Sequence, residues 1–184
     1  MAGYRLSAFG EMPRTGLPDL FAGPEDYARY VDVMTGAGAI ADASFLWWTL
    51  RPSVRYPTLE LRIADSCPLL EHTLAIAALY RCLVRMADRR PEWNRHLTGA
   101  SRAIAAENLW RAQRDGVRAE LIDAEAGGTV PFAACLDAVL ALVAEDADCQ
   151  LAAFAEARGR GLSEREALGA VVDWLAGATA GSRR

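Results

Sequence analysis

In the run at residues 58–64, polar and apolar side chains alternate strictly from Thr58 to Ile63, and this restricts the local fold more than any other feature of the chain. Side chains along a β-strand point to opposite faces in turn, so the pattern predicts a strand with one apolar and one polar face. A second run, residues 45–50, is aromatic and apolar, and Pro52 is expected to stop it. We expect the two runs to pair as a hairpin.

The polar face of the second predicted strand carries Glu60 and Arg62. Arg51 and Arg55 lie in the predicted connection, and Asp65 follows the strand. Carboxylates bind hard cations such as Mg²⁺, whereas guanidinium groups bind phosphate oxygens and the charge that develops on them. One interpretation is therefore a metal and phosphate site. A solvated face with surface salt bridges would give the same pattern, because antiparallel sheets often keep one side in water.

Helical spacing of apolar residues characterises much of the remaining chain. The first 24 residues are rich in Gly and Pro and predict a strand or extended piece followed by a loop. The helix near 101–115 is expected to end at a left-handed Gly116 and to pair Glu107 with Arg111 on one face. Helices are predicted at about residues 24–35, 69–88, 101–115, 131–145, 149–158 and 163–177.

Strands followed by a run of helices predict an α+β fold, with helices on one face of an antiparallel sheet. We expect one region, residues 1–184, with strands mainly within 1–66 and helices mainly within 69–178. Two or three strands form a small sheet that further strands would ordinarily extend. Part of the sheet is therefore expected outside this polypeptide, and an exposed edge favours self-association or a partner.

Composition and missing motifs exclude several classes of function. A net charge of −4 argues against a nucleic-acid surface. No apolar run reaches the roughly 18 residues of a membrane span, and the N-terminus lacks a secretory pattern, so the cytoplasm is expected. The sequence contains neither a nucleotide-binding glycine loop nor a serine elbow or paired Cys and His for nucleophilic catalysis. Any ATP site would have to lie on the open face of a sheet.

Three motifs, in order along the chain, resemble the carboxylate-amine ligases of the YbdK type, which are members of the glutamate-cysteine ligase family. The hairpin motif comprises Trp47-Trp48, Arg51-Pro52, the TLELR strand at residues 58–62, and Asp65. Upstream, PRTGLPDLF at residues 13–21 precedes the first predicted helix, and downstream ENLWRAQRDG at 107–116 is followed by LID. The resemblance covers nearly the whole chain.

The resemblance implies a fold similar to glutamine synthetase, a curved antiparallel sheet whose open face binds Mg²⁺ and ATP, with helices behind it. Enzymes of this family activate a carboxylate as an acyl phosphate, which an amine attacks to give an amide. By resemblance Glu60 would be a metal ligand and Arg62 would contact the transferring phosphate. Arg51 would line the same catalytic cleft, and Arg51 and Arg55 would join Arg62 in binding the nucleotide.

Family members are about twice as long as this chain, and their N-terminal half supplies further strands, most metal-binding carboxylates and much of the amino-acid site. The resemblance thus implies small-molecule amino-acid substrates and a partner, either that N-terminal half or a second copy of the chain. Asn108 and Arg111 match a motif to which we assign a structural or supporting role. Two alternatives stay open: a non-catalytic ligase remnant serving as an interaction module, and an unrelated helical binding protein in which the hairpin is a lid.

Overall fold

The computed structural model describes residues 2–68 and 70–145, which form parts of two compact units. The first unit comprises Met1–Pro68 and Pro91–Asp137, and the second comprises Leu69–Arg90 and Ala138–Arg184. Helices and short strands both occur, so the expected α+β class is confirmed at that level. The predicted helices at 149–158 and 163–177 lie outside the described residues.

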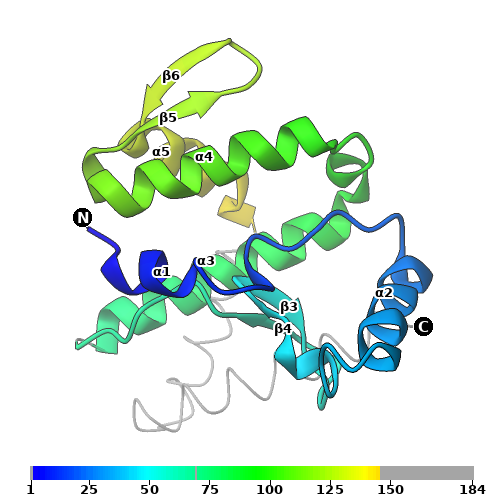
Figure 1. The fold of residues 1–184 in the computed structure, drawn as a ribbon. Helices are drawn as coiled ribbons and strands as arrows, with labels where there is room; N and C mark the ends of the chain where they lie inside the picture. Colours follow the sequence, from blue (N-terminus) through cyan, green and yellow to red (C-terminus); the bar gives the residue numbers. More distant parts are fainter. Residues whose placement is uncertain (1, 69, 146–184) are drawn as a thin grey trace, which may run out of the picture. The chain divides into compact units, whose positions relative to one another are not determined.

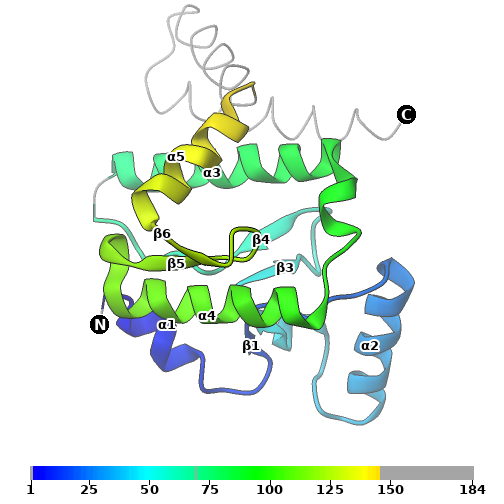
Figure 2. The same cartoon turned by 90° about the horizontal axis from the view of Figure 1, so that it is seen from above.

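The first element is a short helix, α1 at Tyr4–Phe9 (Figure 1), followed by strand β1 at Thr15–Gly16 (Figure 2). The prediction of an extended N-terminal segment is therefore wrong at Tyr4–Phe9. Six residues are too few to show a helical period in the sequence. The segment before the helix is held by the chain far downstream, since the backbone N–H of Gly3 donates to the carbonyl of Gln113 at 2.8 Å.

Helix α2, at Pro24–Gly36, confirms the helix predicted near Pro24. Proline at its first position has a fixed φ suited to a helix start, and Glu25 and Asp26 lie at the positive end of the helix dipole. Its inner face packs on the buried cluster of Ile40, Leu46 and Trp48, through Tyr27, Tyr30, Val31 and Met34. Two residues of this cluster, Leu46 and Trp48, belong to the aromatic and apolar run predicted as the first strand of the hairpin.

The hairpin consists of β3 at Leu50–Pro52 and β4 at Leu59–Leu61, paired antiparallel as predicted (Figure 1). The predicted extent of its first strand is wrong. Ala43–Phe45 form a 3₁₀ turn, and β2 at Trp47–Trp48 pairs in parallel with β1. The Asp42 side chain caps the turn by accepting a hydrogen bond from the Ser44 N–H. The pairing of β2 with β1 joins segments too far apart in the chain for local sequence patterns to reveal.

Helix α4 spans Gly99–Asp115 and begins at a capping box between Thr98 and Ser101. Gly116 ends it with a positive φ of 61°, as predicted, but its ψ of −133° lies outside the left-handed helical region. A 3₁₀ turn at Gly116–Arg118 leads to β5 at Glu120–Asp123, which pairs antiparallel with β6 at Gly128–Pro131. Sequence patterns did not reveal this hairpin. Figure 2 shows β5 beside α4.

The remaining helices are α3 at Leu70–Arg89, a 3₁₀ turn at Pro91–Asn94, and α5 at Phe132–Leu142. The helix predicted at about 131–145 begins one residue later, because Pro131 is the last residue of β6, and it ends earlier, at Leu142. In the second unit Cys82 and Met86 of α3 pack on Val143. None of the described helices combines the length and apolarity needed to cross a membrane.

The strands of the described residues form three separate two-stranded sheets, one of them parallel. The single antiparallel sheet expected from the sequence is therefore not seen within this part of the chain. Each sheet is too small to be stable alone and depends on the helices and loops packed against it.

Candidate functional site

Arg51 and Glu60 lie directly opposite each other in the β3–β4 register. The Arg51 Nε donates to Glu60 Oε2 at 2.9 Å, and Arg51 Nη1 donates to the carbonyls of Ser44 and Leu46. Only 9% of the Arg51 side chain is exposed, compared with 35% for Glu60. A buried guanidinium with three acceptors therefore holds the Glu60 carboxylate in place.

The carboxylate of Glu60 is surrounded by positive charge. The hydrogen bond from Arg51 is the main cause that lowers the pKa of Glu60 below its usual value, against a smaller opposing effect of burial. Arg62 approaches the same oxygen, with Nη1 at 3.8 Å from Oε2. Glu60 is therefore ionised at neutral pH. The alternation in the sequence correctly predicted that Glu60 and Arg62 share a face.

Arg62 also lines a pocket of about 250 Å³ in the first unit. The backbone N–H of Arg62 donates to the carbonyl of Thr49 at 2.8 Å, which anchors the residue just beyond β4. Arg5 of α1, Trp47 of β2 and Gln113 of α4 also line it. Of the four residues predicted to form the site, Arg62 alone is among those that line this pocket.

The other predicted residues lie around Arg62 at different depths. Arg51 lies behind Glu60, whereas Arg55 is exposed in the β3–β4 connection with its guanidinium 5.4 Å from the Tyr56 ring centre. Asp65 accepts from Arg5 Nη1 at 3.1 Å. The structure thus brings together Arg51, Glu60 and Arg62, and it leaves Arg55 outside this contact network.

Arg5 is a candidate binding residue that sequence reasoning missed. It lies 60 positions from Asp65, and the predicted extended segment gave no reason to place it near the hairpin. Only the pairing of β1 with β2 and the docking of α1 on α4 bring it there. No local pattern in the sequence could have identified it.

The described residues offer few ligands for a metal ion. Within residues 2–68 and 70–145, no group of three or more His, Cys, Asp or Glu could hold a metal. Mg²⁺ is commonly held by one or two carboxylates together with substrate phosphates and water. Glu60 fits one such ligand, because it is ionised and partly exposed. The described residues do not supply a complete protein cage.

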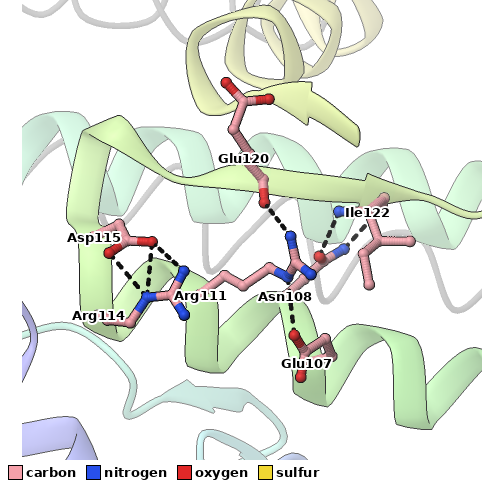
Figure 3. A network of polar contacts seen from close by, with 7 residues as sticks. All are labelled: Glu107, Asn108, Arg111, Arg114, Asp115, Glu120 and Ile122. Atoms are coloured by element: carbon pink, nitrogen blue, oxygen red, sulfur yellow. Dashed lines mark hydrogen bonds and ion pairs between the residues drawn. The ribbon is translucent and has the colours of Figure 1, made fainter. Parts of the chain in front are cut away.

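Asn108 and Arg111 of α4 contact β5 (Figure 3). The Asn108 side chain donates to the carbonyl of Ile122 at 3.0 Å and accepts from the Ile122 N–H at 2.7 Å. Arg111 donates to Glu107 at 2.9 Å, the predicted pair, and to the carbonyl of Glu120 at 3.1 Å. Both side chains therefore fasten the strand to the helix, which is a structural role.

Residues 2–176 match the model of glutamate-cysteine ligase family 2. The chain belongs to this family. It is 44% identical over 194 residues to a protein of Rhodospirillum rubrum provisionally named glutamate–cysteine ligase 2, with 94% of this chain and 50% of that protein covered. A protein of the same provisional name from Bradyrhizobium diazoefficiens is 46% identical over 148 residues, covering 80% and 34%. The predicted family is confirmed.

This member of glutamate-cysteine ligase family 2 spans about half the length, or less, of the curated relatives it matches. Its three motif segments all lie in the first unit, where they form β1 and β2, the β3–β4 hairpin, and α4 with β5. The motifs are therefore neighbours in one compact unit, although they are spread over 110 positions.

Proposed function

We propose that this chain supplies part of the active site of an ATP-dependent carboxylate-amine ligase of the glutamate-cysteine type. The observation that carries the proposal is the pair of Glu60 and Arg62, an ionised carboxylate 3.8 Å from a guanidinium that lines a pocket, in a chain of this family. The proposed activity uses ATP and Mg²⁺, which supports a cytoplasmic location.

The proposed reaction has two steps. An oxygen of the substrate carboxylate attacks the terminal phosphorus of ATP, which forms an acyl phosphate and releases ADP. The amine nitrogen of the second substrate then attacks the acyl carbon, the carbon–oxygen bond to phosphate breaks, and an amide, inorganic phosphate and a proton are released. The substrates are small amino-acid-like molecules, one presenting a carboxylate and the other an amine.

Each predicted site residue has a proposed task. Arg62 contacts oxygens of the transferring phosphate, because a guanidinium matches their geometry and stabilises their developing charge. Glu60 supplies one carboxylate oxygen to Mg²⁺. Arg51 orients Glu60 and keeps it ionised, and so acts at the edge of the catalytic cleft. Arg55 contacts the nucleotide from the exposed end of the hairpin.

We further propose that the complete site belongs to a larger sheet of the glutamine synthetase type. The two-stranded β3–β4 sheet would be extended by strands of a partner, which would also provide the remaining metal-binding carboxylates. That partner corresponds to the part of the relatives that this chain does not match, or else it is a second copy of the chain. The small size of the sheet supports this proposal.

Reconstitution tests the proposal. The chain would be co-expressed with the unmatched half of the Rhodospirillum rubrum relative, and Mg²⁺-ATP binding would be measured by calorimetry, with amide formation as the second readout. Arg62→Ala should weaken nucleotide binding at least about tenfold, since a charge-assisted hydrogen bond is lost. Glu60→Ala should abolish Mg²⁺-dependent turnover. Arg29→Ala, an exposed arginine of α2, is the control and should leave both unchanged.

Unchanged turnover in Glu60→Ala would show that Glu60 is only a surface residue. If neither the chain nor the reconstituted protein binds nucleotide in a manner that depends on Arg62, the ligase proposal fails. A non-catalytic interaction module would then be the better description of the chain.

A further inference from the structure

The charged side chains that line the pocket beside Arg62 are all positive among the described residues. Two arginines line it, Arg5 of α1 and Arg62 just beyond β4. None of the described residues that line it carries a carboxylate, and the remaining lining is apolar or neutral, with Trp47 and Gln113 among it. Cationic walls around a small volume raise the local concentration of anions. The pocket is therefore suited to a negatively charged group.

The ion pair of Arg5 with Asp65 is easily replaced. Arg5 Nη1 donates to Asp65 Oδ1 at 3.1 Å and, at the longer distance of 3.4 Å, to the carbonyl of Ala64, and its guanidinium lies 5.4 Å from the Phe9 ring centre. The Arg5 and Asp65 side chains are 46% and 54% exposed. Exposed ion pairs of this kind contribute little to stability, because water already solvates both groups. Arg5 can thus exchange Asp65 for an oxygen of a ligand inside the pocket.

Arg62 also retains capacity for a ligand. Its closest carboxylate oxygen, Glu60 Oε2, is 3.8 Å away, which is longer than a hydrogen bond. The Arg62 side chain is 38% exposed, and Arg62 lines the same pocket as Arg5. Two guanidinium groups from different elements can therefore converge on one oxyanion.

A third arginine, Arg14, contacts one of the residues that line the pocket. The Arg14 guanidinium lies 5.6 Å from the ring centre of Trp47, a residue that lines the pocket. The Arg14 Nε is buried, and among the described residues it has no acceptor. Arg14 also adopts a positive φ of 63°, a strained conformation of the sort that concentrates at binding sites. Its charge adds to the positive potential at the pocket.

We propose that Arg5 and Arg62 together bind one oxyanion in this pocket, the carboxylate of the acid substrate or a phosphate of the nucleotide, and that Arg5 leaves Asp65 to do so. The two groups share the same chemistry, an oxygen pair that accepts hydrogen bonds from a planar guanidinium. The inference rests on the proposed function in taking the ligand as a ligase substrate. It adds Arg5, which no sequence motif indicated, as a binding residue.

Calorimetry on the full 184-residue chain at low ionic strength tests the inference, with inorganic phosphate in one arm and L-glutamate in the other. Arg5→Gln and Arg62→Gln should each weaken binding of the preferred anion about tenfold or more. Asp65→Asn should strengthen binding about two- to fivefold, because the competing carboxylate is gone. Arg29→Gln removes an exposed arginine elsewhere in the same unit and should change binding less than about twofold.

The Asp65→Asn variant keeps the inference testable if Arg5→Gln disturbs the short helix α1. Weaker or unchanged binding in Asp65→Asn overturns the exchange of Asp65 for the ligand. If Arg29→Gln loses as much affinity as Arg62→Gln, the assignment of the anion to this pocket is overturned. The same holds if the wild-type chain binds neither anion. Stronger binding of phosphate assigns the pocket to the nucleotide, and stronger binding of glutamate assigns it to the acid substrate.

The outcomes separate this inference from the proposed function. Anion binding that depends on Arg5 and Arg62, without turnover in the reconstituted protein, supports the pocket and counts against the ligase. Turnover in the reconstituted protein, together with anion binding that does not depend on Arg5 or Arg62, supports the ligase and counts against the pocket.

Discussion

Arg51 and Glu60 form an ion pair across the β3–β4 hairpin in which the cation is buried and the anion is partly exposed, with 2.9 Å between Nε and Oε2. The same guanidinium donates to two backbone carbonyls of the segment that precedes the hairpin. The pair therefore couples the hairpin to the buried cluster that contains Leu46 and Trp48.

Replacing Arg51 should destabilise the first unit. Arg51→Ala leaves Glu60 and two carbonyls without their buried donor, and we expect a loss of about 2 to 3 kcal/mol in the free energy of unfolding. Urea denaturation followed by tryptophan fluorescence measures this loss. Arg29→Ala serves as the matched control and should stay within about 0.5 kcal/mol of the wild type. A loss below about 1 kcal/mol for Arg51→Ala would refute the anchoring role.

The stability of the chain should decrease in acid through Glu60. Arg51 lowers the folded-state pKa of Glu60 below its unfolded value near 4.5, so the stabilisation is present above about pH 4.5 and is lost as the pH falls through the folded pKa. Glu60→Gln should therefore reduce the difference in urea midpoint between about pH 6 and pH 3. In an Arg51→Ala background the same change should have little effect on that difference, and an equal effect in both backgrounds would contradict this account.

Asn108 should control the local stability of β5. Asn108→Ala removes both hydrogen bonds to Ile122 and should cost about 1 to 2 kcal/mol. Amide hydrogen exchange should show lost protection at Ile122, since its N–H then has no side-chain acceptor. Arg114→Ala removes an exposed pair with Asp115 on the same helix and provides the comparison. Equal exchange at Ile122 in both variants would exclude the proposed fastening.

The backbone at Arg14 should prefer glycine to alanine. Both Arg14→Gly and Arg14→Ala remove the contact with Trp47, but only alanine retains the penalty of a positive φ, about 1 to 2 kcal/mol. Glycine loses more backbone entropy on folding, which offsets part of this difference. We expect the glycine variant to be more stable by roughly 0.5 to 1 kcal/mol in thermal or urea unfolding. An alanine variant of equal or greater stability would show that the backbone is unstrained.

Several features could be predicted because they depend on neighbours in the chain. Alternation identified β4 and placed Glu60 beside Arg62, and a proline start with acidic residues identified α2. The Glu107 and Arg111 pair followed from helical spacing. The order of the motifs also predicted the family, and the match of residues 2–176 to the family model confirms it.

Tertiary structure decided the rest. The sequence did not reveal that β2 pairs with β1, that β5 and β6 form a hairpin, or that Asn108 reaches a strand 14 positions away. The pocket likewise joins Arg5 to Arg62 through the packing of α1. The physical reason is range: sequence periodicity reports which face a side chain occupies within one element. Packing and hydrogen bonds between distant segments determine which elements meet. Those contacts place Arg62, which the sequence showed only as one residue on the polar face of a strand, in a pocket that Arg5 also lines.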